Sequence, residues 1–536
     1  MPTLRLAMLA ALWPLAAGHP PAIARTGPRV RVATGVVEGI VAPSGVQEFR
    51  GIPFAAPPVR DRRWRPPQPA APWSGVRLAD RFAPQCMQAR VYSDMVFRND
   101  ATSEDCLYLN VWTPPHAATA KLPVLVYFYG GGYVAGDGSE YRYDGESMAR
   151  RGIVVVTVNY RLGVFGFFAH PELTRESPHH ASGNYGLLDQ AASIRWVHDN
   201  VAAFGGDPRR VTIGGESAGS FSVSAQMASP LSRGLIAGAI GESGAFFSTT
   251  LTTPPLAQAE RDGERFAASA GAASLAQLRA LGALEILAAA SRPGGARIGP
   301  DVDGWFFPIA PESIYARGAQ AHVPLLAGWN SAELPGEALL HATPTPENVA
   351  RLVETTFGDQ AAAAARYYPA TTPEQAAQSA TELASDRFIA YSTWAWLDAH
   401  AATGGSPVYC YLYAHPRPAT VPAPTQAGQP AEQPAPPAAG AVHSAEIEYA
   451  LGNLATNHVF AWTPDDEKVS ATMESYFANF VRTGNPNGAG LPEWPVGNPT
   501  ADGRAMRMRI DVVSRAEPEP TERYRFLRGF YAARPR

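Results

Sequence analysis

Several kinds of residue and pattern are scarce in this chain of 536 residues, and each scarcity excludes a class of protein. Three cysteines are too few for a small disulfide-rich scaffold. The 44 Lys and Arg against 48 Asp and Glu leave a net charge of −4, which provides no basic footprint for nucleic acid. No His-Glu-x-x-His motif and no Cys/His ligand spacing is present, which argues against a zinc hydrolase. We therefore expect a small molecule, and not nucleic acid, as the partner.

Long hydrophobic runs are also lacking beyond the N-terminus. No stretch after residue 24 offers the ~18 unbroken apolar residues of a membrane-spanning helix, so no membrane partner is expected. What the chain does have is 46% apolar and 17% charged residues, with 50 Pro and 49 Gly. This composition predicts a globular body with many ordered turns and long loops.

The N-terminus has the pattern of a targeting segment. Arg5 precedes an apolar run at residues 6–17, and residues 22–24 (AIA) form a small-x-small cleavage site. These features predict a secretory signal peptide over residues 1–24, and hence a secreted or periplasmic protein. The single Arg and the Pro14 that interrupts the run leave a frayed hydrophobic N-terminus as the alternative.

Short apolar runs bounded by Gly or Pro alternate with helix-like stretches along the chain. This alternation predicts a parallel sheet covered by helices on both faces. The helix-like stretches include residues 185–203 and 218–228. The expected strands lie at residues 124–129, 153–158, 211–213, 235–240, 323–327 and 408–413.

Two Ala-rich regions, residues 255–296 and 345–402, have a helical period and are expected to lie over the carboxyl edge of the sheet. Residues 417–440 are rich in Pro, Ala, Gln and Thr, which predicts an exposed, partly extended loop. Because candidate parts of one site are spread along the chain, we expect a single catalytic domain over residues 25–536.

The strongest sequence signal is the pentapeptide GESAG at residues 215–219. It follows one predicted strand and precedes one predicted helix, which is the setting of a nucleophile elbow. Glycines on both sides of Ser217 permit the strained turn that exposes its hydroxyl. An exposed serine becomes a good nucleophile only with a base nearby. A Gly-rich turn with an idle serine is the alternative.

A second signal is the run of three glycines at residues 130–132, directly after a predicted strand. Without side chains, backbone N–H groups in such a run can approach the oxyanion of a tetrahedral intermediate. A plain turn is the alternative reading of the three glycines.

Two longer segments resemble the sequence signatures of the type-B carboxylesterases, a family that includes bacterial para-nitrobenzyl-type esterases, animal carboxylesterases and cholinesterases. They are residues 204–219 (FGGDPRRVTIGGESAG) and 104–112 (EDCLYLNVW). Shorter matches occur at residues 50–55, 159–163, 183–190 and 484–487. The resemblance implies an α/β-hydrolase fold, with a large, mostly parallel mixed sheet, helices on both faces and helical insertions over the active site. It also implies a Ser-Glu-His triad that needs no metal and no cofactor.

The resemblance places the acid of this triad at Glu333 and the base at His443. The family pattern Gly-x-Asn-x-Asp-Glu-Gly is altered here by Ala332 and Leu334, although the glutamate itself is kept. The chain order 217, 333, 443 agrees with the order of nucleophile, acid and base in α/β-hydrolases. In these roles His443 accepts the Ser217 proton, and Glu333 fixes the tautomer of the imidazole.

The resemblance implies three further roles: donors of an oxyanion hole, a polar layer beside the triad, and a buried structural ion pair. The matching residues are Gly131, Gly132 and Ala218 for the oxyanion hole, Glu216, Ser243 and Glu446 for the polar layer, and Glu104 and Arg161 for the ion pair.

The cysteines are expected to form one disulfide. We predict that Cys86 pairs with Cys106, because closing the short loop between them restricts the unfolded chain by ~3 kcal/mol. Cys410 lies in a predicted strand and is expected to pack in the core.

Cholinesterase-like sites hold a quaternary ammonium on a Trp in this first disulfide loop. The loop here has Tyr92 and Phe97 but no Trp, which argues against choline esters.

Together these patterns predict a serine hydrolase that forms an acyl-enzyme on Ser217 from a carboxylic ester. One alternative keeps this mechanism but acts on an amide, carbamate or thioester. The other is a non-catalytic binding module of the same fold. Neither the natural substrate nor the oligomeric state follows from these patterns.

Overall fold

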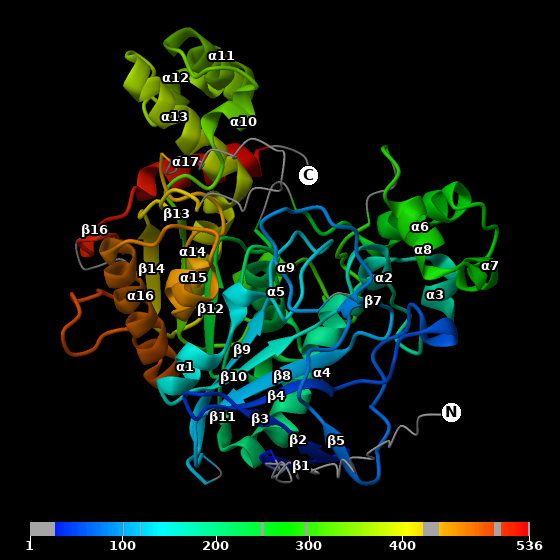
Figure 1. Ribbon diagram of the computed structural model, residues 1–536. Coiled ribbons are helices and arrows are strands. Elements are labelled where there is room, and N and C mark those ends of the chain that lie inside the picture. The colour runs from blue at the N-terminus through cyan, green and yellow to red at the C-terminus, as the bar shows by residue number, and fades with distance from the viewer. Residues whose placement is uncertain are drawn as a thin grey trace, which may run out of the picture.

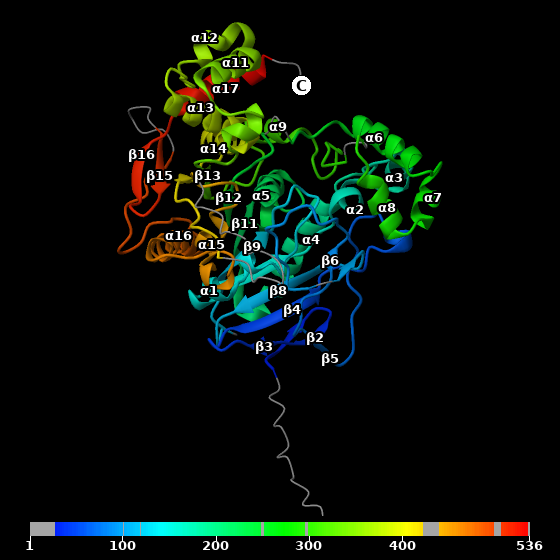
Figure 2. The same ribbon diagram turned by 45° about the horizontal axis from the view of Figure 1, so that its top comes forward.

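The computed structural model describes residues 27–99, 101–117, 119–247, 251–294, 298–421, 439–497 and 505–533. The predicted signal peptide at residues 1–24 and residues 422–438 of the predicted Pro-rich loop lie outside the described residues. Figures 1 and 2 show the described part as a central sheet with helices around it.

The largest sheet within the described residues has 11 strands (Figure 1). From edge to edge they are β16 (Arg515–Pro518), β15 (Met506–Ile510), β14 (Val408–Tyr413), β13 (Leu325–Asn330), β12 (Gly238–Glu242), β11 (Gly206–Glu216), β9 (Leu122–Phe128), β10 (Val154–Val158), β8 (Tyr108–Thr113), β4 (Gln47–Pro53) and β3 (Ile40–Val41). Neighbouring strands from β15 to β10 pair in parallel, and the pairs outside this block are antiparallel. The predicted large, mostly parallel mixed sheet is therefore confirmed.

The central strands are buried along their whole length. Every residue of β10 (VVVTV), β13 (LLAGWN) and β14 (VYCYLY) is buried, which requires cover on both faces of the sheet. Such near-continuous apolar runs are what the sequence revealed, and the six predicted strands correspond to β9 to β14. The edge strand β16 (RAEP) is largely exposed and has no apolar run, so no pattern predicted it.

Two smaller sheets lie beside the large one. One consists of β1 (Arg29–Val32), β2 (Gly35–Glu38) and β5 (Val76–Leu78), and the other of β6 (Gln85–Cys86) and β7 (Thr102–Ser103).

Helices α4 and α5 pack against β11, as does α16, and α14 packs against β13 and β14. The helices around the sheet are α1 (Glu146–Arg150), α2 (Gly163–Phe167), α3 (Pro171–Glu176), α4 (Tyr185–Asn200), α5 (Ala218–Ala228), α9 (Pro311–Ala316), α14 (Tyr391–Thr403), α15 (Ile447–Leu451), α16 (Pro464–Thr483) and α17 (Thr521–Ala532). The helices predicted at residues 185–203 and 218–228 thus correspond to α4, with a following 3₁₀ turn, and to α5.

Two groups of short helices form separate lobes, which lie far apart in both ribbon views (Figures 1 and 2). The first lobe contains α6 (Leu256–Ser269), α7 (Leu275–Ala280) and α8 (Ala283–Ala290), and the second contains α10 (Gly336–Leu340), α11 (Pro346–Phe357), α12 (Ala361–Ala364) and α13 (Pro373–Ser385). Both Ala-rich regions are therefore helical, as predicted.

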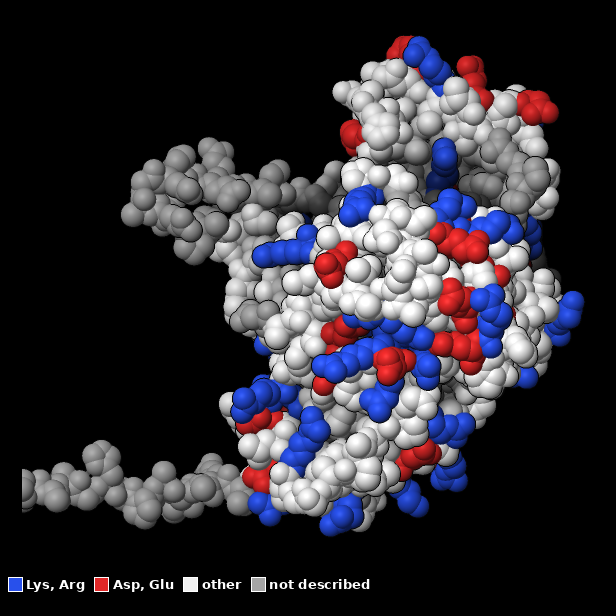
Figure 3. Space-filling model, turned by 90° about the vertical axis from the view of Figure 1, so that its right-hand side faces the viewer, with Lys and Arg blue, Asp and Glu red and all other residues white. Residues whose placement is uncertain are grey.

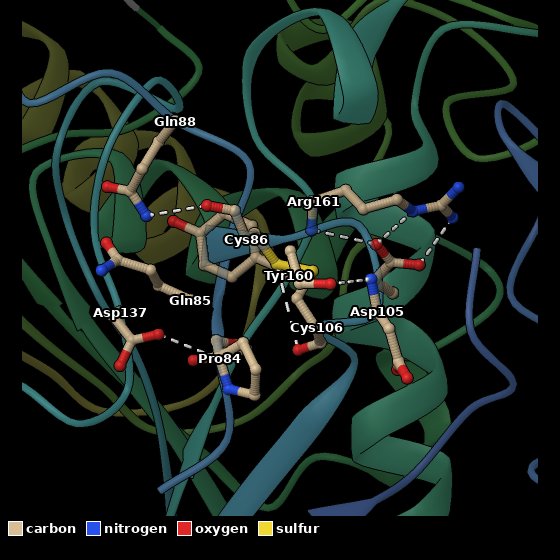
Figure 4. Close-up of a disulfide and its surroundings, with 12 residues drawn as sticks. Pro84, Gln85, Cys86, Gln88, Asp105, Cys106, Asp137, Tyr160 and Arg161 are labelled. Atoms are coloured by element: carbon tan, nitrogen blue, oxygen red, sulfur yellow. Dashed lines mark hydrogen bonds and ion pairs between the residues drawn. A yellow bond between two sulfur atoms is a disulfide. The ribbon is translucent and has the colours of Figure 1, made fainter. Parts of the chain in front are cut away.

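The predicted disulfide is present. Cys86 and Cys106 are bonded to each other, and Cys410 is a free, buried side chain on β14. Figure 4 shows the disulfide close to Arg161 and Gln88, whose side-chain amide donates to the Cys86 carbonyl at 3.1 Å. The disulfide therefore closes the loop at residues 86–106.

The predicted ion pair between Glu104 and Arg161 is wrong. Glu104 accepts two hydrogen bonds from Arg63, at 2.6 and 2.7 Å. Arg161 donates to both carboxylate oxygens of Asp189 on α4, at 2.8 and 2.7 Å. Each carboxylate faces a guanidinium in a two-pronged arrangement, which is the strong geometry for this pairing. Two separate ion pairs, one partly and one fully buried, therefore replace the single pair that was expected.

Charged side chains of both signs lie interspersed on the face of the molecule drawn in Figure 3. Among the described residues, no helix combines the length and the apolar character needed to cross a membrane.

Candidate active site

Ser217 occupies a sharp turn between the end of β11 and the start of α5. Its backbone has φ 53° and ψ −120°, a strained conformation for a residue with a side chain. The neighbouring chain leaves no room for larger residues. A Cβ on Gly219 would lie 2.0 Å from the Phe128 carbonyl oxygen, and one on Gly215 would lie 2.6 Å from the Gly219 carbonyl carbon. The two glycines thus allow the predicted strand–turn–helix to form.

The structure brings Ser217, His443 and Glu333 together from three distant parts of the chain. Nε2 of His443 lies 2.9 Å from Oγ of Ser217, and Nδ1 lies 2.7 Å from Oε2 of Glu333. Glu333 follows β13, and His443 lies on the loop that comes after β14. Because β11, β13 and β14 belong to one parallel block, the segments that follow them meet at its carboxyl edge.

The carboxylate of Glu333 is held by hydrogen bonds from two sides. Its Oε1 accepts from the backbone N–H of Asn330 at 2.7 Å and from the Ser243 hydroxyl at 2.5 Å. Asn330 in turn donates from its side-chain amide to Oε2 of Glu446 at 2.5 Å. The Ser243 hydroxyl also lies 3.3 Å from Oε1 of Glu446. These contacts fix the orientation of the carboxylate that faces the imidazole.

Buried carboxylates set the electrostatics around His443. Burial lowers the pKa of the imidazole, but the charges of Glu216 and Glu333 outweigh this effect and raise the pKa to about 9. Burial raises the pKa of Glu216 to about 8, against the lowering effect of the His443 charge. Burial together with the Glu333 charge raises the pKa of Glu446 to about 7. The carboxylates around His443 therefore favour its charged form, the imidazolium.

The three residues predicted to donate to an oxyanion lie together. Gly131, Gly132 and Ala218 line a cavity of about 410 Å³ beside Ser217. Gly131 has φ 108° and Gly132 has φ 63°, both in the region that favours glycine. A Cβ on Gly131 would lie 2.3 Å from the Ala135 carbonyl oxygen. The chain can follow this path beside the serine only because the side chains are missing.

The remaining wall of the cavity has an apolar and a polar part, which the sequence did not reveal. The apolar part is formed by Phe221, Leu251, Phe388 and Ile389, and the polar part by Tyr92, Asp94, Arg142 and Ser444, with Met95 also lining the cavity. In the sequence, Tyr92 drew attention as an aromatic residue of the disulfide loop, and Phe221 as an aromatic residue beside the serine motif that could line an apolar gorge. No motif surrounds Arg142 or Asp94, so no pattern could have identified them.

A sequence model described as "Carboxylesterase family" matches residues 26–526. The chain belongs to the carboxylesterase family. As a member of this family it is a carboxylic ester hydrolase with an α/β-hydrolase fold. The match extends over both helical lobes and all strands of the large sheet, so the family assignment does not rest on the serine motif alone.

Similar proteins include enzymes named for different esters. The chain is 35% identical to a fumonisin B1 esterase of Sphingopyxis macrogoltabida, in an alignment that covers 86% of this chain and 83% of the relative. It is also 35% identical to a cocaine esterase of Homo sapiens, with 85% of this chain and 82% of the relative covered. Among solved structures, the carboxylesterase EST55 of Geobacillus stearothermophilus aligns with a TM-score of 0.76 and 32% identity, covering 93% of this chain and 99% of the other.

No group of three or more His, Cys, Asp and Glu side chains that could hold a metal ion occurs in the part of the chain that the structure describes.

Proposed function

We propose that this carboxylesterase acts through an acyl-enzyme on Ser217, with His443 as the base and Glu333 as the acid of the triad. The observation that carries the proposal is the short, continuous contact from Ser217 Oγ through the His443 imidazole to the Glu333 carboxylate, at 2.9 and 2.7 Å. This chain of contacts opens on a cavity large enough for a small ester.

In the first half of the reaction, Ser217 Oγ attacks the ester carbonyl carbon while Nε2 of His443 takes the hydroxyl proton. The carbonyl oxygen becomes an oxyanion and accepts hydrogen bonds from the backbone N–H groups of Gly131, Gly132 and Ala218. Collapse of the tetrahedral intermediate breaks the bond to the alcohol oxygen. The departing alcohol receives the proton from His443, and the acyl group stays on Ser217.

In the second half, water replaces the alcohol. His443 takes a proton from the water, the resulting hydroxide attacks the acyl carbon, and a second oxyanion forms in the same place. Its collapse returns the proton to Ser217 Oγ and releases the carboxylic acid. Throughout, Glu333 holds Nδ1–H of His443 and stabilises the imidazolium.

Glu216, Ser243 and Glu446 act on the triad without touching the substrate carbonyl in this proposal. Ser243 keeps the Glu333 carboxylate facing the imidazole, as its 2.5 Å contact supports. Oε1 of Glu446 lies 3.3 Å from the Ser243 hydroxyl and helps to hold it in place. Glu216 lies 3.3 Å from Nε2 of His443 and stabilises the charged imidazole when ionised.

The ester bond is the preferred target over an amide or carbamate. Relatives equally similar to this chain, at 35% identity, are named for fumonisin B1, for cocaine and for fatty acyl-CoA, which is a thioester. Since these names share the hydrolysis of an ester or thioester, we propose ester hydrolysis as the property that this chain retains, with a thioester as the alternative. The apolar part of the cavity wall suits an ester with an apolar group on one side of the carbonyl.

Hydrolysis of p-nitrophenyl butyrate tests the proposal. We expect turnover by the wild-type protein, and loss of nearly all of it in Ser217→Ala. Ser44→Ala is the matched control, because Ser44 is exposed and lies outside the cavity. Equal rates for Ser217→Ala and Ser44→Ala would reject the serine mechanism, and absence of turnover by the wild-type protein would leave a non-catalytic binding role.

We also propose that residues 1–24 are a signal peptide and that residues 25–536 form one exported catalytic domain. The disulfide between Cys86 and Cys106 supports an oxidising compartment outside the cytoplasm. N-terminal sequencing of protein recovered from the periplasm or medium should begin at Arg25. Recovery of the full-length chain from the cytoplasm alone would contradict the proposal.

A further inference from the structure

A buried arginine lies in the polar part of the active-site wall. Arg142, in a 3₁₀ turn at Tyr141–Tyr143, is only 5% exposed, yet it lines the same cavity as Ser217. Its neighbour in this wall is Ser444, the residue directly after His443. A guanidinium is costly to bury and stays charged at every physiological pH, so its position in the substrate cavity calls for an anionic partner.

Acidic groups of the protein already stabilise this charge, because burial lowers the pKa of Arg142 but the charges of nearby acidic groups, that of Glu140 most, outweigh this effect and raise the pKa. Nε of Arg142 donates to Oε1 of Glu140 at 2.5 Å, in a buried ion pair. The pair uses one oxygen, since Oε2 of Glu140 is buried without a hydrogen bond. Burial also raises the pKa of Glu140 to about 7, against the opposing charge of Arg142. The ion pair with Glu140 therefore engages Nε of Arg142 and leaves Nη1 for other partners.

The other arm of the guanidinium makes two long contacts. Nη1 of Arg142 lies 3.3 Å from the Ser444 hydroxyl and 3.4 Å from Oδ2 of Asp94. Charge-assisted hydrogen bonds are normally ~2.7–2.9 Å long, so both contacts are weak. Asp94 is 55% exposed, and it can exchange this contact for water at little cost.

Given the proposed esterase mechanism, on which this inference rests, we propose that Arg142 binds a carboxylate carried by the substrate beside its scissile ester. The substrate carboxylate replaces Asp94 on Nη1, and Asp94 turns to solvent. The preferred substrates are thus esters in which either the acyl half or the alcohol half bears a carboxylate group. The guanidinium then gains a desolvated, close partner in place of a long contact to an exposed one.

The apolar and the polar residues lie in separate parts of the cavity wall, which favours a substrate with one anionic end and one apolar end. Ile389 and Phe221 both approach Gly244, where a Cβ would lie 3.2 Å from Ile389 Cδ1 and 2.5 Å from Phe221 Cε2, so the apolar residues cluster. Arg142 contacts Asp94 and Ser444 in a separate cluster. An ester carbonyl at Ser217 has one substituent on each side, and in this proposal one of them lies toward the arginine.

Two matched ester pairs test this proposal. On the alcohol side, 4-carboxyphenyl acetate is compared with phenyl acetate. On the acyl side, the p-nitrophenyl monoester of adipic acid is compared with p-nitrophenyl hexanoate. The measured quantity is the ratio of kcat/KM for the anionic ester to that for the neutral ester. Intrinsic differences in reactivity cancel when this ratio is compared between variants.

We expect the double variant Glu140→Gln/Arg142→Gln to lower this ratio by roughly tenfold or more for one of the two pairs. Replacing both residues avoids leaving a buried Glu140 without its counter-charge. Asp94→Asn removes the competing carboxylate and should raise the same ratio severalfold. Arg209→Gln is the matched control, because it removes one positive charge from a side chain that is 81% exposed and outside the cavity, and it should leave both ratios unchanged.

Ratios that stay within about twofold of the wild-type values in both Asp94→Asn and the double variant overturn this inference. If the double variant does not fold, the Asp94→Asn variant tests the inference alone. A rise in either ratio then supports the inference, and two unchanged ratios overturn it. In these cases continued hydrolysis of phenyl acetate leaves the proposed function intact. Absence of Ser217-dependent turnover of all four esters instead overturns the proposed function, and this inference with it.

Discussion

Oε1 of Glu216 lies 3.3 Å from Nε2 of His443, the same ring nitrogen that lies 2.9 Å from the Ser217 hydroxyl. The carboxylate and the hydroxyl therefore compete for one proton position. Glu216 Oε1 is buried and has no hydrogen-bond partner, so its main interaction is electrostatic and is directed at the imidazole. In the proposed mechanism, the residue just before Ser217 therefore controls how readily the His443 imidazole becomes neutral.

This relationship predicts the pH dependence of the reaction. The base works only when neutral, and the pKa of His443 is raised to about 9, so kcat/KM should rise with pH with an apparent pKa above 6.5. Glu216→Gln removes one of the charges that raise this pKa, and the profile should therefore shift toward lower pH. The measurement is kcat/KM for p-nitrophenyl butyrate from pH 5 to 10, corrected for spontaneous hydrolysis. A profile that is unchanged or shifted to higher pH in Glu216→Gln would contradict this account.

Replacing the acid of the triad should affect chemistry much more than folding. In Glu333→Gln the amide can no longer favour the tautomer that presents a basic Nε2, and kcat should fall by ~10⁴. Near-ultraviolet circular dichroism should remain as in the wild type. Glu354→Gln, on an exposed position of α11, serves as the control for loss of one negative charge. A Glu333→Gln enzyme with the wild-type kcat would mean that the acid lies elsewhere.

The glycine backbone beside the serine should tolerate no side chain. In Gly131→Ala the new Cβ would lie 2.3 Å from the Ala135 carbonyl oxygen, and φ is 108°. The loop must shift, which should displace one oxyanion donor and lower kcat by ~10²–10³. Gly75→Ala, at another positive φ but with open space around the Cβ, separates local backbone strain from catalysis. Similar kcat values for the two variants would argue against donors at this position.

The disulfide should contribute to stability through the loop that it closes. Cys86→Ser/Cys106→Ser removes a link with a sequence separation of 20, and the free energy of unfolding should fall by ~3 kcal/mol. The loop carries Tyr92 and Asp94 of the cavity wall, so KM should change as well. Denaturant titration of both proteins measures the first effect. A midpoint equal to that of the wild type would show that the link is not formed in the purified protein.

The parts of the site that could be predicted from the sequence are those with local constraints. The turn at Ser217 requires small neighbours within a few residues, and such a requirement leaves a short motif. Glu333 and His443 leave no such trace, since they are separated by 110 residues and meet because β13 and β14 are neighbours in the sheet. Only the resemblance to a family, with its fixed register, identified them.

The parts that could not be predicted depend on long-range packing of side chains. Glu104 and Arg161 were expected to pair, yet each finds a partner that offers two parallel hydrogen bonds, Arg63 and Asp189 respectively. Arg142 reaches the active site only because a 3₁₀ turn far from the serine motif folds against the loop of His443. Short exposed edge strands such as β16 have no apolar run to reveal them.

The most direct test of the central claim is to trap the nucleophile. Incubation with a fluorophosphonate, followed by digestion and mass spectrometry, should find one phosphonyl group per chain, on Ser217. His443→Ala should be labelled far more slowly, because the base that activates the hydroxyl is absent. Labelling at a different serine, or no labelling of a protein that still hydrolyses p-nitrophenyl butyrate, would contradict the account.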